Sequence, residues 1–275
     1  MAVTSHTPTV FILGLSSDIG REMALRFAHQ GWRVAGTYRQ GKGLEALAET
    51  KGVAAIPCDA GDPYSIAMAL DEYAALDAPW DLFLSSIGTM EPIGPFFDLD
   101  FGDWEKSVTV NSTAQLRMLH GLYPLRRQGD ISHAMFFAGM GTNNVTPNYS
   151  AYIASKIMLI KMCEQLDAEA PDLNVFIIGP GFIPTKIIQE TVRAGDRAGE
   201  NLQKTLDFLD NPGTNLNDVF THITWCMEQG REVAGGRNFS SVHDPWRDGG
   251  EQLAGDLKAD KDMFKLRRCG SGGGQ

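Results

Sequence analysis

The sequence predicts an α/β protein built on a doubly wound parallel sheet. Short apolar segments alternate six times with segments of helical periodicity, and the connections between them are short. The first apolar segment, residues 10–13, is hydrophobic on both faces, as a central parallel strand is. This alternation is typical of a parallel sheet with helices on both sides, and of one domain rather than two domains or repeats.

The elements follow one another in a regular order. Strands are expected at residues 10–13, 32–38, 53–57, 80–84, 131–137 and 173–178, with a short last strand at 236–242. Helices are expected at 21–30, 44–50, 64–76, 101–127 and 215–229, and another carries Tyr152 and ends near residue 170. These elements place one domain of about seven strands at residues 1–245, with a partly helical lid at 184–212. The polar residues 246–275 are expected to form a mobile tail.

Composition excludes several classes of function. A formal charge of −10 over 275 residues argues against a nucleic-acid-binding surface. The four cysteines lack the spacing of a zinc site or of a disulfide framework, so no metal and a reducing compartment are expected. No signal peptide or bilayer-length apolar run is visible, so we expect a cytoplasmic protein that does not bind membranes.

A glycine-rich turn follows the first strand. Its residues are Gly14, Leu15, Ser16, Ser17, Asp18, Ile19 and Gly20, and a helical pattern starts directly after it. Backbone N–H groups and the positive end of a helix dipole bind phosphate in such a turn, and the two serines add hydroxyl donors. An ordinary strand–helix turn is the alternative interpretation.

The end of the second strand bears on the choice of cofactor. An acid there binds the ribose hydroxyls of NAD, whereas a base accommodates the extra phosphate of NADP. This strand ends in Tyr38 and Arg39, which favours NADP(H), with NAD(H) possible. Asp59, followed by Ala60, comes just after the third strand and can accept a hydrogen bond from adenine or cap the next helix.

Tyr152 and Lys156 lie four residues apart in an expected helix and so share one face. A lysine ammonium beside a phenol favours the phenolate, and such a pair makes a general acid/base that works near neutral pH. An amphipathic surface pair is the alternative. Asn111 lies in the middle of another expected helix, where asparagine is a poor helix former without a specific partner.

Most of these features follow the ends of strands. In an open α/β sheet, ligands bind outside the carboxyl ends of the strands where the strand order reverses. The features that meet there are the glycine turn, Arg39, Asp59, residues 85–88, 139–142 and 180–181, and the start of the Tyr152 helix. Their common placement supports a dinucleotide site with an acid/base pair.

In the glycine turn, Asp59, Asn111 and the Tyr152–Lys156 pair, the chain resembles the short-chain dehydrogenases/reductases. These are Rossmann-like enzymes, and the resemblance covers about residues 8–245. The resemblance assigns Tyr152 and Lys156 to the acid/base pair and Asn111 to a helix position whose disturbed backbone holds a water in a proton relay. It implies that Lys156 lowers the tyrosine pKa and binds the ribose. It assigns the cofactor contacts to Gly14, Ser16, Ser17, Asp18, Ile19, Gly20, Tyr38, Arg39, Asp59, Ala60, Ser86, Gly88, Pro180, Gly181, Ile183 and Thr185.

Three positions depart from the family pattern. Asp18 replaces the middle glycine of the cofactor turn, and Ser85-Ser86-Ile87-Gly88 replaces Asn-Asn-Ala-Gly after the fourth strand. The family also places a serine thirteen residues before the tyrosine, where this chain has Gly139.

The missing hydroxyl matters because the loss of one oxyanion donor costs on the order of 10²–10³ in rate. Three outcomes remain open. Thr142, Asn143 or Asn144 replaces the donor; a backbone N–H of the Gly139-Met140-Gly141 turn does so; or the enzyme is slow or lacks redox activity. We expect substrate contacts from Gly139, Met140, Thr142 and Asn143.

The sequence therefore predicts an NADP(H)-dependent oxidoreductase acting on a carbonyl compound or secondary alcohol. A dinucleotide-binding sensor or partner subunit is the second hypothesis. A sugar-modifying epimerase or dehydratase is the third, although few residues follow Gly181 to build a substrate domain. Basic lid residues are compatible with an anionic, sugar-derived substrate or with a solvated face. The resemblance implies a homodimer or homotetramer.

Overall fold

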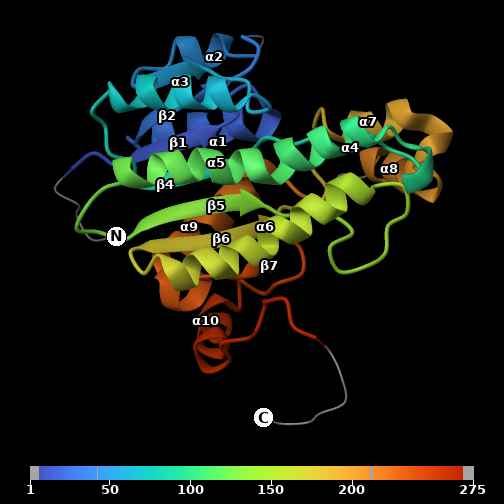
Figure 1. The fold of residues 1–275 in the computed structure, drawn as a ribbon. Helices are drawn as coiled ribbons and strands as arrows, with labels where there is room; N and C mark the ends of the chain where they lie inside the picture. Colours follow the sequence, from blue (N-terminus) through green and yellow to red (C-terminus); the bar gives the residue numbers. More distant parts are fainter. Residues whose placement is uncertain (1–5, 42, 211–212, 269–275) are drawn as a thin grey trace.

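Seven parallel strands form one sheet in the computed structural model, which describes residues 6–41, 43–210 and 213–268 (Figure 1). The strand order is β3-β2-β1-β4-β5-β6-β7, and it reverses between β1 and β4. The predicted doubly wound, Rossmann-like sheet of seven strands is therefore confirmed. The strands are β1 (Thr9–Leu13), β2 (Arg33–Tyr38), β3 (Val53–Pro57), β4 (Leu82–Ser85), β5 (Ser132–Phe137), β6 (Leu173–Gly179) and β7 (Asn238–Ser240).

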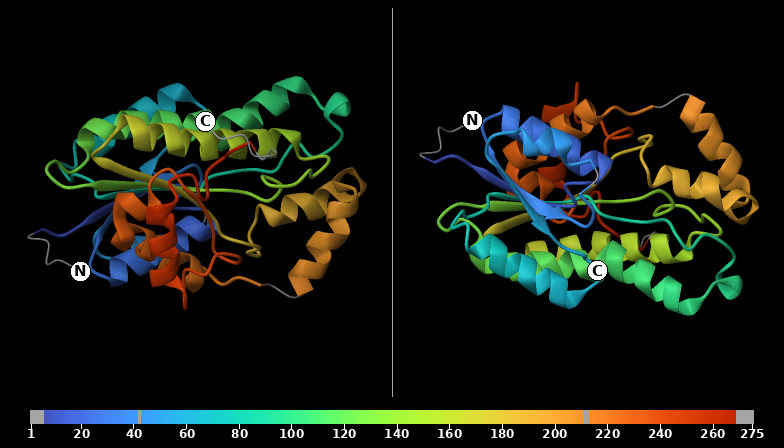
Figure 2. Two further views of the ribbon diagram at one scale, coloured as in Figure 1. Left: turned by 90° about the horizontal axis from the view of Figure 1, so that it is seen from below. Right: turned by 90° about the horizontal axis from the view of Figure 1, so that it is seen from above.

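Helices cover both faces of the sheet, and Figure 2 shows the two layers edge-on. One apolar core joins the sheet to α1 (Asp18–His29) and α9 (Leu216–Ala234). A second core joins the other face to α3 (Pro63–Ala74), α5 (Ala114–Leu122) and α6 (Ser150–Glu169). The short α2 (Glu45–Ala48) lies against α1. None of the helices in the described residues is long and apolar enough to cross a membrane.

Local sequence signals account for where two of these helices begin. Ser17 caps α1, because its hydroxyl oxygen accepts a hydrogen bond from the backbone of Gly20 at 2.9 Å. Asp62 caps α3 in the same way, and Pro63 occupies the first helical position. Asp59 is not the cap, so its carboxylate is not committed to that helix.

The expected helix over residues 101–127 is wrong as a single element. It divides into α4 (Phe101–Val108), a π-helical turn (Thr109–Thr113) and α5, and it ends in a 3₁₀ turn at Tyr123–Leu125. Helical periodicity continues through the π turn, so the apolar pattern did not reveal the break. Asn111 lies at its centre and was the one sign of it.

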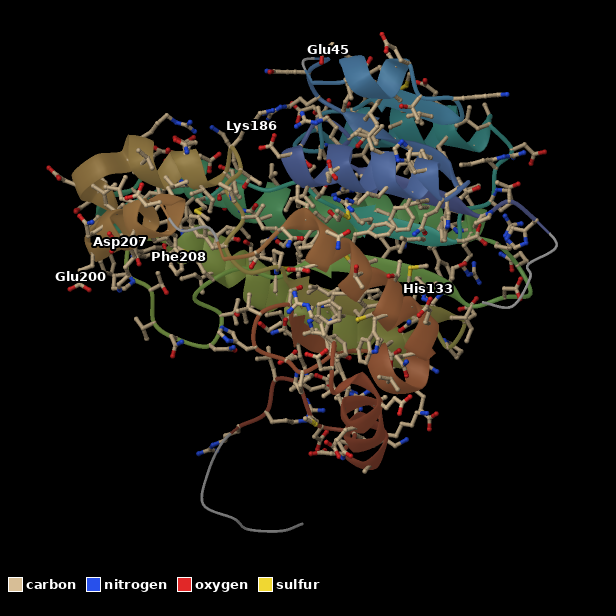
Figure 3. All side chains as sticks on the ribbon, turned by 180° about the vertical axis from the view of Figure 1, so that it is seen from behind. Glu45, His133, Lys186, Glu200, Asp207 and Phe208 are labelled. Atoms are coloured by element: carbon tan, nitrogen blue, oxygen red, sulfur yellow. The ribbon has the colours of Figure 1, made fainter. Side chains whose placement is uncertain are left out.

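The lid consists of two short helices that project beyond the sheet (Figure 3). They are α7 (Ile188–Ala194) and α8 (Glu200–Asp210), joined by a 3₁₀ turn. Residues 211 and 212 lie outside the described part. Beneath α7 is a third apolar cluster, separate from the two main cores, formed by Met90, Ile93, Tyr149, Tyr152, Ile188, Ala194 and Ala198.

The expectation of a mobile polar tail is wrong for residues 246–268. They contain α10 (Gly250–Ala259), whose Leu253 and Leu257 are buried in the same core as Trp246. The buried Arg237 fastens this segment, because its guanidinium donates to five backbone carbonyls, those of Glu232, Val233, Leu257, Asp260 and Met263. Residues 269–275 lie outside the described part.

Candidate active site

A large cavity opens at the carboxyl ends of the strands, where the order reverses between β1 and β4. Its volume of about 1120 Å³ accommodates a dinucleotide together with a small substrate. Of the residues predicted for the site, only Gly20 and Asn111 are absent from its lining. Those that line it are Gly14, Ser16, Ser17, Asp18, Ile19, Tyr38, Arg39, Asp59, Ala60, Ser86, Gly88, Gly139, Met140, Thr142, Asn143, Tyr152, Lys156, Pro180, Gly181, Ile183 and Thr185.

The glycine turn brings the start of α1 close to the sheet. A Cβ on Gly20 would overlap the carbonyl oxygen of Gly14 and the hydroxyls of Ser17 and Ser86, so only glycine fits. The Ser17 hydroxyl also donates to Ser86 at 3.0 Å, which links the turn to the end of β4. This close approach fits the diphosphate of a dinucleotide at the helix N-terminus.

Asp18 connects the turn to the start of the lid. Its Oδ2 accepts a hydrogen bond from the backbone N–H of Lys186 at 2.8 Å, and its Oδ1 lies 3.7 Å from the lysine Nζ. Arg21 lies 3.5 Å from the same carboxylate. The acid that replaces the family glycine is therefore partly neutralised by two cations beside the expected phosphate position.

Arg39 and Asp59 stand at the far end of the cavity. Arg39 is exposed, directly after β2, and the neighbouring Tyr38 is partly buried. Asp59 is exposed after β3, and its Oδ1 accepts a hydrogen bond from the backbone of Gly61 at 2.9 Å. These side chains provide a cation, an aromatic ring and an acceptor where the adenosine half of a dinucleotide would bind.

Asn111 lies behind the cavity wall and fixes the loop after β4. It is fully buried; its Oδ1 accepts from the Thr89 N–H at 2.9 Å and its Nδ2 donates to the Thr89 carbonyl at 2.8 Å. Its own carbonyl accepts from the Gln115 side chain at 3.0 Å. The disturbed backbone that the resemblance implies is present as the π turn.

Tyr152 and Lys156 share one face of α6 and are both buried. The Lys156 Nζ donates to the Phe137 carbonyl at 2.9 Å and lies 5.6 Å from the centre of the Tyr152 ring. Burial lowers the pKa of Lys156 to about 8. Burial raises the pKa of Tyr152, and the Glu190 carboxylate raises it further. Both effects oppose the lowering of the tyrosine pKa by Lys156 that the resemblance implies, and that lowering stays a prediction.

The loop after β5 lacks a serine and has no space for one. A Cβ on Gly139 would overlap the hydroxyl and ring of Tyr152. Thr142 donates its hydroxyl hydrogen to the Gly139 carbonyl at 3.2 Å, within its own turn. Asn143 and Asn144 are exposed and line the cavity.

Further residues line the cavity although the sequence did not predict them. Glu190, on α7, is one, and its role depends on contacts with residues about a hundred positions away. Phe264, Lys265 and Leu266 line the cavity from the segment that was read as a tail. No local motif in the sequence marks any of these residues.

Comparison with known families shows which family the chain belongs to. The family described as enoyl-(acyl carrier protein) reductase matches residues 14–210, more than half of the chain. The chain belongs to the short-chain dehydrogenase/reductase family. Its members are oxidoreductases that bind NAD or NADP and act on small molecules.

Relatives within the family are named as dehydrogenases. Serine 3-dehydrogenase of Agrobacterium fabrum is 27% identical over 233 residues, which span 82% of this chain and 90% of that protein. D-threitol dehydrogenase of Mycolicibacterium smegmatis is 25% identical over 183 residues, which span 64% of this chain and 70% of that protein. These names belong to the relatives and leave the substrate of this chain open.

Solved structures share the fold at lower sequence identity. The KRED1-Pglu enzyme superposes with a TM-score of 0.77 at 22% identity, over 84% of this chain and all of that one. A short-chain dehydrogenase from Shigella flexneri, solved in complex with NADP, gives a TM-score of 0.70 at 22% identity, over 85% of this chain and 96% of that one. At these identities the likeness establishes the fold.

Proposed function

We propose that this chain is an NADP(H)-dependent oxidoreductase that transfers a hydride between the nicotinamide and a carbonyl compound or secondary alcohol. One observation carries the proposal. The Tyr152–Lys156 pair lines the same cavity as the glycine turn at the start of α1. A proton donor and a phosphate cradle in one cavity are what such a reaction requires.

Tyr152 is the general acid/base. Bound NADPH supplies the hydride for reduction, and NADP⁺ accepts it in oxidation. In the reductive direction Tyr152 gives its phenolic proton to the carbonyl oxygen, and in the oxidative direction its phenolate takes the proton of the alcohol. Lys156 stabilises the phenolate and binds the ribose, and the Phe137 carbonyl holds its ammonium in place. Asn111 acts indirectly, by fixing Thr89 between Gly88 and Met90, which line the cavity.

The preference for NADP(H) rests on Arg39. Its exposed guanidinium follows β2 directly, and no acid occupies that strand end. A guanidinium there pairs with a 2′-phosphate through charge-assisted hydrogen bonds, and NADH offers no such group.

The oxyanion donor in this proposal is Asn143 or Asn144. Both amides line the cavity and are exposed, whereas the Thr142 hydroxyl is already donated to the Gly139 carbonyl. A dinucleotide-binding protein with weak redox activity is the second candidate, and the absence of a hydroxyl at Gly139 is the observation that favours it.

The relatives direct the choice of substrates to test. Their names point to hydroxy compounds with a neighbouring polar group, such as β-hydroxy amino acids and polyols. The basic lid residues offer less support for an anionic substrate than the sequence indicated, because Lys186 pairs with Asp18 and Lys204 with Glu200.

The deciding experiment combines binding and turnover. NADPH and NADH are titrated by their fluorescence, and a panel of alcohols and carbonyl compounds is then assayed through the absorbance of the reduced cofactor. We expect turnover with NADPH that Tyr152→Phe abolishes while NADPH affinity stays within about twofold. Turnover that survives this substitution would overturn the mechanism, and tight binding without turnover on any class would favour the second candidate.

A further inference from the structure

Tyr152 shares an apolar cluster with residues of the lid. Its ring belongs to the small apolar cluster that Ile188 of α7 joins from above and Met90 from the loop after β4. Only 6% of the tyrosine is exposed. The position of α7 therefore determines the surroundings of the phenol.

Glu190 fastens α7 to the loop after β4. Its Oε2 accepts hydrogen bonds from the Met90 backbone N–H at 2.6 Å and from the Thr89 hydroxyl at 3.0 Å. The next residue, Thr191, accepts from the Tyr149 hydroxyl at 3.0 Å, at the start of the helix that carries Tyr152. The helix α7 is thus attached on two sides of the phenol, and Glu190 supplies the only charged contact in this attachment among the described residues.

The loop that Glu190 holds is itself fixed from below. Asn111 binds both the N–H and the carbonyl of Thr89, and the Thr89 side chain reaches Glu190. A continuous chain of hydrogen bonds therefore runs from the π turn through Thr89 to the lid. Gly88 and Met90, on either side of Thr89, line the cavity, so these bonds connect α7 to the cavity wall.

The charges that face the phenol come from two elements. Lys156 lies on the same helix as Tyr152, and Glu190 faces it from α7. Glu91, in the loop after β4, acts on Glu190 and on Tyr149, and it raises the pKa of both. Burial is the main cause of the raised Glu190 pKa, and the bonds from Met90 and Thr89 oppose it.

On the basis of the function proposed above, we propose that Glu190 is a positioning residue for the acid/base step. It closes α7 onto the loop after β4 and presents a carboxylate to the phenol, so that Tyr152 stays protonated and ready to donate to a carbonyl oxygen. The substrate needs no contact with Glu190 for this role.

Two substitutions separate the charge from the fastening. Glu190→Gln removes the charge but keeps an oxygen that accepts from Met90. Thr89→Val removes the hydrogen bond that the hydroxyl donates to Glu190 and the one that it accepts from the Glu91 N–H, and it keeps the charge. Glu200→Gln is the matched control, because Glu200 is an exposed carboxylate on the outer side of the lid (Figure 3) and its loss changes the lid charge equally.

The pH profile of kcat/KM in the reductive direction is the first measurement. With Glu190→Gln, we expect the decline at alkaline pH to move about one pH unit lower, because the phenol ionises more easily without a nearby negative charge. Thr89→Val should raise KM severalfold without moving this decline. The proposal fails if the Glu190→Gln profile superimposes on that of the wild type, or if Glu200→Gln shifts it equally.

Limited proteolysis of the lid is the second measurement and requires no activity. Thr89→Val should speed cleavage within residues 186–210 severalfold, whereas Glu190→Gln, which keeps an acceptor for Met90, and Glu200→Gln should change it little. If the wild type turns over nothing, the proposed function fails, and this measurement still decides whether Glu190 fastens the lid. Equal cleavage rates in all four proteins would overturn the fastening role.

Discussion

The phenol of Tyr152 occupies the space that a side chain on residue 139 would need. A Cβ built on Gly139 would overlap the hydroxyl oxygen and two ring carbons of the tyrosine. The position of the tyrosine therefore depends on the absence of the family serine. The glycine allows the proton donor to lie against the backbone of the loop after β5.

Restoring the serine should consequently damage the enzyme. We expect Gly139→Ser to lower kcat on the order of 10²-fold, because it displaces the phenol from its place over the cavity. NADPH affinity should change little. Gly255→Ala, on α10, is the control, since a Cβ there meets no atom within 4 Å. A Gly139→Ser variant that turns over faster than the wild type would contradict this account.

Replacing Arg39 should change the choice of cofactor. We expect Arg39→Ala to weaken NADPH binding by about 10- to 100-fold, the size of a lost charge-assisted hydrogen-bond pair, and to leave NADH binding unchanged. Fluorescence titration of both cofactors measures the effect. Arg33→Ala removes an exposed arginine at the opposite end of β2 and should affect neither cofactor. Equal losses for NADPH and NADH would show that Arg39 does not recognise the 2′-phosphate.

We expect the negative charge of Asp18 to weaken cofactor binding, and its substitution to strengthen it. Asp18→Asn keeps an oxygen for the Lys186 N–H and removes a negative charge beside the expected diphosphate. We expect severalfold tighter NADPH binding, which diminishes at high salt. Asp18→Ala loses the contact with the lid as well, so it should also speed proteolysis after residue 185. Weaker NADPH binding by Asp18→Asn would mean that the carboxylate assists the cofactor.

Two histidines, the fully buried His222 and the partly buried His133, should make the fold acid-sensitive. Burial lowers the pKa of His222 to about 3 and that of His133 to about 4. Above pH 6.5 both are neutral in the folded and unfolded chain. Below pH 6.5 the two histidines take up protons in the unfolded chain but stay neutral in the folded one. The free energy of unfolding therefore falls toward pH 4, by ~1.4 kcal/mol per pH unit for each histidine.

Urea denaturation at several pH values tests this dependence. His222→Phe can keep the stacking on Trp246, whose ring centre lies 4.3 Å away, and should flatten the decline between pH 6.5 and 4. His120→Gln replaces an exposed histidine and should leave the slope as it is. A slope that is unchanged in His222→Phe would assign the acid sensitivity to other groups.

The sequence predicted the sheet and most of the cavity lining because these depend on local signals. Apolar segments that end in Gly, Ser or Asp marked the strand ends, and parallel strands bring those ends to one edge. Glu190 could not be found in this way, because its partners Thr89 and Met90 lie about a hundred residues away. The helix α10 was missed since its apolar residues are few, and their burial depends on α9 and Trp246.

The hydrogen bonds of Arg237 determine where the C-terminal region can be shortened or extended. Three of the five carbonyls that receive its guanidinium belong to residues 257–263, so a chain cut before α10 would leave a buried cation with most of its acceptors missing. Such a cut would undermine β7 and the end of α9 as well, although both precede it in the sequence. Fusion partners and affinity tags are therefore better joined after residue 268 than at the boundary near residue 245.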